Sequence, residues 1–147
     1  MDMLAGIEAS FSGLEAQRIR MNVIAANLAN AQTTRTPEGG PYKPQRVVFG
    51  AQPQASAFAQ LFDQQQIEHG LSQVYVVDIV DDPQGTRLQY EPNHPDANPA
   101  GYVAYPNISV IQEMVDLMTA TRAYEANITV IKASKAMAAS ALQIGQG

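Results

Sequence analysis

Residues 109–144 contain neither glycine nor proline, and this run constrains the fold more than any other part of the sequence. It starts shortly after Pro106 and stops at Gly145. Its apolar residues recur at alternating steps of three and four, the spacing of a coiled-coil seam. The seam positions are Val110, Met114, Leu117, Thr121, Tyr124, Ile128, Ile131, Lys135, Ala138 and Leu142. The pattern predicts one long amphipathic helix that begins at Ser109, since Gln112 follows it at capping-box spacing.

A second helical pattern lies at the other end of the chain, over residues 3–31. Gly6 and Gly13 weaken its first turns, because a helical glycine costs about 1 kcal/mol relative to alanine. Its seam consists of Leu4, Ile7, Phe11, Leu14, Arg18, Met21, Ala25 and Leu28. The two seams predict that the terminal helices pair as a coiled-coil stem while the middle of the chain forms an insertion between them.

The middle of the chain has a different character. Five prolines and glycines within residues 37–44 exclude a helix there. β-Branched and aromatic residues predict strands at 47–49, 71–80, 86–91 and 102–105, and the turn residues 82–85 predict that the second and third form a hairpin. Residues 52–66 predict a loop or a short helix. The expected fold class is α+β, with a discontinuous helical stem over 1–31 and 108–147 and an extended, β-rich insertion over 32–107.

The composition excludes several classes of function. Only 9 Lys and Arg stand against 14 Asp and Glu, so there is no basic footprint for nucleic acid. No apolar run approaches the length of about 20 residues that a membrane span needs, and the first residues lack the pattern of a cleavable signal peptide. With no cysteine, disulfides and thiolate metal sites are impossible. The sequence predicts no cofactor, no metal and no catalytic residue.

Two motifs resemble the terminal signatures of bacterial flagellar rod, hook and filament-junction proteins. One is SGLEAQR at 12–18 leading into NVIAANLANAQTT at 22–34, and the other is EMV at 113–115 followed by ATRAYEAN at 120–127. The segments 90–96 and 101–107 are similar to those of the proximal-rod branch of that family. The resemblance implies a structural subunit of the flagellar basal-body rod, which spans the periplasm and transmits motor torque. It also implies assembly with copies of itself and with other rod proteins, and export through the flagellar type III apparatus.

The resemblance and the seams together give the expected subunit interface. Its residues are Leu4, Ile7, Phe11, Leu14, Arg18, Met21, Asn27, Leu28, Asn30, Met114, Leu117, Arg122, Tyr124, Asn127, Ile128 and Ile131. Neighbouring chains are expected to cover further apolar positions, namely Ile19, Ile24, Ile111, Val115, Met118 and Val130.

Individual polar residues of this interface have two interpretations each. Asn27 and Asn30 either end the first helix by ordinary capping or also hydrogen-bond across subunits. Arg18 and Arg122 either pair with acidic residues of neighbours or are solvated surface residues of little energetic weight.

Other functional classes rest on weaker patterns. A soluble coiled-coil adaptor would have the same two seams, and only the signature motifs favour the rod subunit over it. His94-Pro95-Asp96 is the tripeptide of J-domain cochaperones, but without the flanking helices of that domain it predicts a turn. Asp78, Asp81, Asp82 and His94 could be imagined as a metal-dependent enzyme site, yet no metal-ligand spacing is present.

Overall fold

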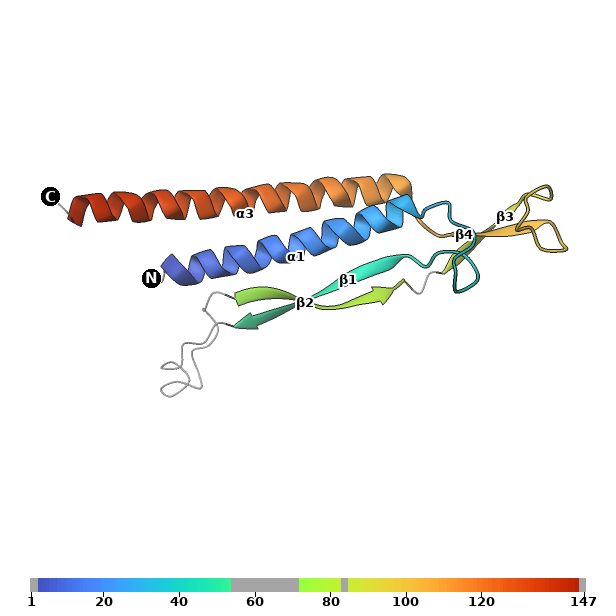
Figure 1. Cartoon of the computed structure of the whole chain (residues 1–147), viewed down its shortest axis with the longest axis horizontal. Helices are drawn as coiled ribbons and strands as arrows, with labels where there is room; N and C mark the ends of the chain where they lie inside the picture. The colour runs from blue at the N-terminus through green and yellow to red at the C-terminus, as the bar shows by residue number, and fades with distance from the viewer. Residues whose placement is uncertain (1–2, 54–71, 83–84, 146–147) are drawn as a thin grey trace. The chain divides into compact units, whose positions relative to one another are not determined.

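The computed structural model describes residues 3–53, 72–82 and 85–145 (Figure 1). Within these residues, one helix lies at each end and four strands lie between them. The elements are α1 (Met3–Ala29), β1 (Gln45–Pro53), β2 (Ser72–Asp81), β3 (Thr86–Tyr90), β4 (Tyr102–Pro106) and α3 (Val110–Gly145). A helix near each end of the chain, with strands between the two, confirms the predicted α+β class.

Both terminal helices form where the sequence predicts them, within about two residues, which is the usual uncertainty of a helix end. Ser109 is the N-cap of α3, because its Oγ accepts a hydrogen bond from the Gln112 N–H at 3.4 Å and its carbonyl accepts one from the Glu113 N–H at 3.0 Å. The Gln112 side chain donates to Asp116 at 3.3 Å.

The segment between α1 and β1 is irregular, as predicted. Gly39 and Gly40 have φ of 90° and 81°, a region that favours glycine. The Thr36 N–H closes the turn that they form by donating to the Gly40 carbonyl at 2.8 Å. The Tyr42 N–H donates to the Thr33 carbonyl at 3.1 Å. After α1 the chain therefore turns and continues as β1.

The strands pair differently from the prediction. β1 pairs with β2, and β3 pairs with β4, so the expected hairpin between residues 71–80 and 86–91 is wrong. β1 is nine residues long, far longer than the predicted 47–49, and it occupies the position beside β2. β3 instead pairs antiparallel with β4, placing Tyr90 opposite Tyr102 and Arg87 opposite Tyr105. Such aromatic cross-strand pairs stabilise this alternative. Residues 54–66 of the predicted loop or helix lie outside the described part of the chain.

The chain divides into two compact units. Unit 1 comprises residues 1–19, 49–77 and 120–147, and unit 2 comprises residues 20–48 and 78–119. Both helices and both strands of the β1–β2 sheet contribute to each unit. The expected division into a helical stem over 1–31 and 108–147 and an insertion over 32–107 stays a prediction.

Unit 1 joins the start of β2 to α1 through a side chain. The Ser12 Oγ accepts a hydrogen bond from the Val74 N–H at 3.1 Å and donates to the Ala9 carbonyl at 2.8 Å. In the same unit Gly13 lies against Asn127, since a Cβ at Gly13 would be only 2.9 Å from the Asn127 Nδ2. A glycine therefore permits the close approach of these two helical segments.

The helices bury a different stripe from the predicted seams. Several seam residues are exposed, namely Phe11, Arg18, Ala25, Val110, Met114, Thr121, Lys135 and Leu142. The buried positions of the helices are instead Ala16, Val23, Ile24, Asn27, Ala120 and Ser134. Most of these side chains are small or polar, so the structure does not confirm a coiled-coil pairing built on the large apolar seam residues. Ile24, expected to be covered by a neighbouring chain, is buried within its own.

Candidate functional site

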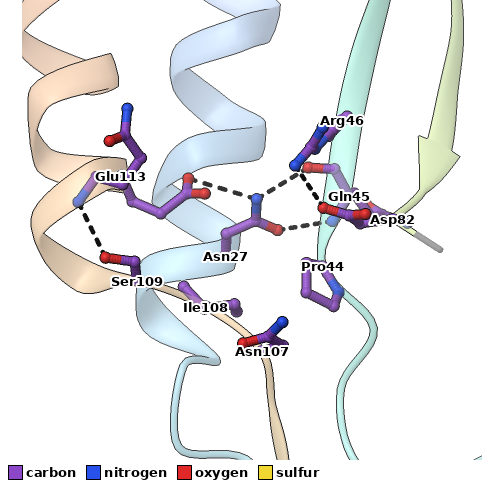
Figure 2. Close-up of a pocket in the computed structure, with 10 residues that line it drawn as sticks. Asn27, Pro44, Gln45, Arg46, Asp82, Asn107, Ile108, Ser109 and Glu113 are labelled. Atoms are coloured by element: carbon purple, nitrogen blue, oxygen red, sulfur yellow. Dashed lines mark hydrogen bonds and ion pairs between the residues drawn. The ribbon is translucent and has the colours of Figure 1, made fainter. Parts of the chain in front are cut away.

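Asn27 is the centre of a polar junction in unit 2. Its side chain projects from α1 between the start of β1 and the first turn of α3 (Figure 2). The residue is only 3% exposed, although it carries a carboxamide. A buried amide is stable only where its hydrogen-bonding groups are satisfied.

Every hydrogen-bonding position of the Asn27 side chain has a partner in the chain. The Nδ2 donates to the Gln45 carbonyl at 2.9 Å and to a Glu113 carboxylate oxygen at 3.5 Å. The Oδ1 accepts from the Gln45 N–H at 2.9 Å and from the Tyr42 hydroxyl at 3.1 Å. Asn27 thus pairs with the backbone of β1 as a neighbouring strand would, and it has no capacity left for a bond across subunits.

Burial in the junction raises the pKa of two ionisable groups. Burial raises the pKa of the Glu113 carboxyl above its usual value, and the opposing effects of the Asn27 hydrogen bond and of Arg46 and Arg20 do not cancel it. Burial also raises the pKa of the Tyr42 hydroxyl, and the charges of Asp81 and Glu113 add to that effect. Both groups are therefore held more firmly in their neutral forms.

Ion pairs flank the junction on two sides. The Arg46 guanidinium contacts the Asp82 carboxylate at 2.7 Å, and the Asp82 N–H donates to the Pro44 carbonyl at 2.7 Å, so β1 is tied to the end of β2. Arg20 contacts Asp116 at 3.4 Å, which links α1 to α3 within unit 2. The open space beside Asn27, about 240 Å³, is lined by residues of these same elements (Figure 2). The junction therefore connects α1, β1, the end of β2 and α3 through polar contacts.

The Asn30 side chain hydrogen-bonds groups near the end of its own helix. Its Nδ2 donates to the Ala26 carbonyl at 2.9 Å and its Oδ1 accepts from the Thr33 hydroxyl at 3.1 Å. These bonds satisfy groups at the end of α1. No described residue other than glycine has a positive φ, so the helix ends without a left-handed asparagine.

Comparison with known proteins places this architecture in a family. Residues 7–35 match the family described as "Flagella basal body rod protein", and residues 100–144 match "Flagellar basal body rod FlgEFG protein C-terminal". The chain is 43% identical to the flagellar basal-body rod protein FlgC of Borreliella burgdorferi over the full length of both chains. It is 39% identical to FlgC of Bacillus subtilis, covering 99% of this chain and 100% of the relative. The chain belongs to the FlgC family of flagellar basal-body rod proteins.

Membership of the FlgC family settles the class of function. The chain is a structural component of the flagellar basal-body rod, and it is not an enzyme. The family assembles with other rod components, and this replaces the adaptor and enzyme alternatives. No described helix is long and apolar enough to span a membrane.

The remaining predicted interface residues of this FlgC-family chain differ in exposure. Arg18 and Arg122 are exposed, and neither takes part in an ion pair of the described residues. Half-buried positions are Ile7, Leu14, Met21, Leu28, Leu117, Tyr124, Asn127, Ile128 and Ile131. The side chain of Leu4 lies outside the described part of the structure.

The first turns of α3 carry an apolar surface that this FlgC-family chain leaves open. Ile111 is 78% exposed and Met118 is 56% exposed, with Met114 and Val115 between them. These four residues fall on one side of the helix, opposite Glu113 and Ala120. We refer to them as the α3 patch, and all four belong to unit 2.

The residues of the imagined metal site have other roles. Asp82 is paired with Arg46, and the His94 Nδ1 accepts the Asp96 N–H at 3.1 Å inside a turn, as predicted for the tripeptide. Within the described ranges, no group of three His, Asp or Glu side chains could hold a metal ion.

Sequence reasoning missed the Asn27 contacts and the two ion pairs. Two of the four partners of Asn27 are backbone groups of Gln45, and backbone groups leave no trace in a sequence. One signal was present, because Asn27 lies three and four residues after the apolar Ile24 and Val23 and so shares their buried side of α1.

Proposed function

We propose that this FlgC-family chain polymerises, with copies of itself and with other rod proteins, into a helical shaft that transmits motor torque across the periplasm. The observation that carries the proposal is the α3 patch, which is apolar and uncovered in the single chain. Soluble monomers rarely expose contiguous apolar surface of this kind, and where they do, it marks an interaction site.

The energy available from these side chains is considerable. Covering a large apolar side chain contributes about 1.5–3 kcal/mol, so a few such residues supply the free energy of a specific contact. Contacts between different surfaces of identical subunits, if their rotation does not close a ring, produce helical filaments. A rod is such a filament.

Further residues of the terminal helices belong to the proposed interface. Arg18 and Arg122 are exposed cations that can pair with acidic residues of neighbours. The apolar members are Leu4, Ile7, Phe11, Leu14, Met21, Leu28, Leu117, Tyr124, Ile128 and Ile131. Asn27 is not among them, because its bonds are met within the chain.

The single chain has a small interior, which supports a second part of the proposal. Among the described residues only six hydrophobic side chains are buried, and three of these are alanines. Such a core gives little stability to an isolated subunit. We propose that the chain passes unfolded through the flagellar type III apparatus and completes its folding when neighbours cover the α3 patch.

The proposal is tested by charging the α3 patch in a flagellated bacterium that lacks its own FlgC-family chain. Met118→Lys is expected to abolish incorporation into isolated basal bodies and swimming. Thr119→Lys is the matched control, since Thr119 is the next residue, is also exposed and lies beside the patch. Incorporation is measured by immunoblotting of basal bodies. Normal rods and swimming with Met118→Lys would refute the role of the patch.

A further inference from the structure

Tyr90 and Tyr102 lie directly opposite each other on the paired strands β3 and β4. The backbone of Tyr102 is turned away from β3, because its N–H donates to the Asn98 Oδ1 and its carbonyl accepts from the Asn98 N–H, each at 2.9 Å. The two tyrosines are therefore a non-hydrogen-bonded cross-strand pair, the kind in which the side chains lie closer together.

The two phenol rings are in contact, and the backbone helps to hold them there. They form an edge-to-face pair with their centres 5.3 Å apart and their planes inclined at 65°. Tyr90 also lies across Gly101, where a Cβ would come within 2.8 Å of the ring carbon Cε2. Gly101 has a φ of 80°, which favours glycine, so no side chain at this position pushes the Tyr90 ring away from β4.

Both rings are accessible to an oxidant in solution, since Tyr90 is 63% exposed and Tyr102 is 42% exposed. Other tyrosines of the chain are placed differently. Tyr105 lies on the opposite face of β4, where its hydroxyl donates to Glu91 at 2.9 Å, and Tyr42 is half-buried in the Asn27 junction. Among the described residues, no other two tyrosine rings are in contact. The Tyr90–Tyr102 pair therefore combines contact with exposure.

We propose that Tyr90 and Tyr102 are a site of oxidative dityrosine formation within the single chain. The co-substrate is hydrogen peroxide, used by a haem peroxidase that removes one electron at a time. Each phenol loses one electron and one proton, and a ring carbon next to each hydroxyl then joins the other in a carbon–carbon bond. The hydrogen on each of these carbons moves to its own phenol oxygen, which restores both aromatic rings. The two electrons and two protons convert one peroxide into two waters.

This bond gives the chain a covalent cross-link that its composition otherwise denies it, since the sequence has no cysteine for a disulfide. It joins β3 to β4 and closes the loop of residues 91–101, and thiol reductants do not break it. Closing a loop restricts the unfolded chain, as a disulfide does, so the cross-linked chain is expected to unfold at a higher urea concentration. Assembly into a rod is not required, because both tyrosines belong to one chain.

Treatment of the purified full chain with peroxide and a haem peroxidase tests this site. At low protein concentration, dityrosine fluorescence is expected in the monomer band of a denaturing gel. Proteolytic cleavage before Asp96 separates the two tyrosines, so mass spectrometry should find the two fragments joined, with a mass two hydrogen atoms below their sum. Tyr90→Phe and Tyr102→Phe keep the ring but lack the hydroxyl, and each is expected to lose both signals.

Tyr75→Phe is the matched control, because it removes the hydroxyl of a tyrosine that is 48% exposed on β2. This variant is expected to keep the fluorescence and the joined fragments of the wild type. Absence of dityrosine from the wild-type monomer, fluorescence confined to dimers, or fluorescence that persists in Tyr90→Phe would each overturn the proposal.

Discussion

The carboxamide of Asn27 hydrogen-bonds both backbone groups of Gln45, each at 2.9 Å. An asparagine on a helix here takes the place of a neighbouring strand, so that β1 begins against α1 at a fixed register. The Tyr42 hydroxyl and the Glu113 carboxylate complete the set. In unit 2, one side chain thus links both terminal helices and the first strand.

This relationship makes Asn27→Asp a disruptive change despite its small size. The aspartate has no N–H to offer, so the Gln45 carbonyl loses its partner and a carboxylate replaces the donor that faced Glu113. Leaving a buried group unsatisfied next to a like charge is expected to cost about 3 kcal/mol. Urea unfolding of the purified chain measures the loss.

Asn22→Asp is the control for that experiment, because it makes the same chemical change at an exposed position of α1. It is expected to change stability by less than about 0.5 kcal/mol. Equal losses in the two variants would show that the Gln45 bonds do not stabilise the fold.

Glu113 gives the stability of the chain a defined dependence on pH. Burial raises the pKa of Glu113 in the folded chain above its ordinary value of about 4.5. The folded state then binds the proton more tightly than the unfolded state. The stability from this group is fully present below about pH 4.5 and is lost as the pH rises through the folded pKa.

Glu113→Gln is expected to remove this loss, since the glutamine side chain stays neutral and can still accept the Asn27 hydrogen bond. Relative to the wild type, the variant should gain stability as the pH rises from about 4 to about 7. Urea unfolding at several pH values measures the difference. Glu125→Gln, at an exposed position of α3, serves as the baseline. A difference between wild type and Glu113→Gln that does not change with pH would contradict the assignment.

The parts of the fold that the sequence predicts are those with local causes. Ser109 caps α3 because its hydroxyl reaches a nearby N–H, and Gly39 and Gly40 turn the chain because they can adopt positive φ. No such local feature of the sequence determines which strand pairs with β2. Turn residues follow β2 at 82–85, yet β2 pairs with β1, from which 18 residues of the chain separate it.

The seam pattern also failed to predict which side of each helix is buried. Periodicity identifies stripes of large apolar residues, but small residues allow close packing. Ala120 is fully buried and Ala16 is 3% exposed, whereas Phe11 of the predicted seam is 65% exposed. In a chain made for assembly, large apolar residues need not face their own core.

Arg122 tests the proposed pairing across subunits. It is exposed and has no ion-pair partner among the described residues. If a neighbour's carboxylate pairs with it in the rod, Arg122→Ala should weaken subunit association by about 2 kcal/mol, roughly thirtyfold. The measurements are swimming and the amount of chain in isolated basal bodies. Lys132→Ala removes another exposed cation from α3 and is expected to have no effect. Unchanged rods and swimming with Arg122→Ala would leave the residue as an ordinary solvated cation.

Gly13 tests the close approach to Asn127 in unit 1. An alanine in a helix is about 1 kcal/mol more favourable than glycine, so Gly6→Ala, where a Cβ would meet nothing within 4 Å, should stabilise the chain by about that amount. At Gly13 the same Cβ would lie 2.9 Å from the Asn127 Nδ2, and displacing that side chain should cancel the gain. Adding Asn127→Ala to Gly13→Ala should restore it, which gives a coupling energy of about 1 kcal/mol in a double-mutant cycle followed by urea unfolding. If Gly13→Ala stabilises the chain as much as Gly6→Ala does, then Asn127 does not press against this glycine in solution.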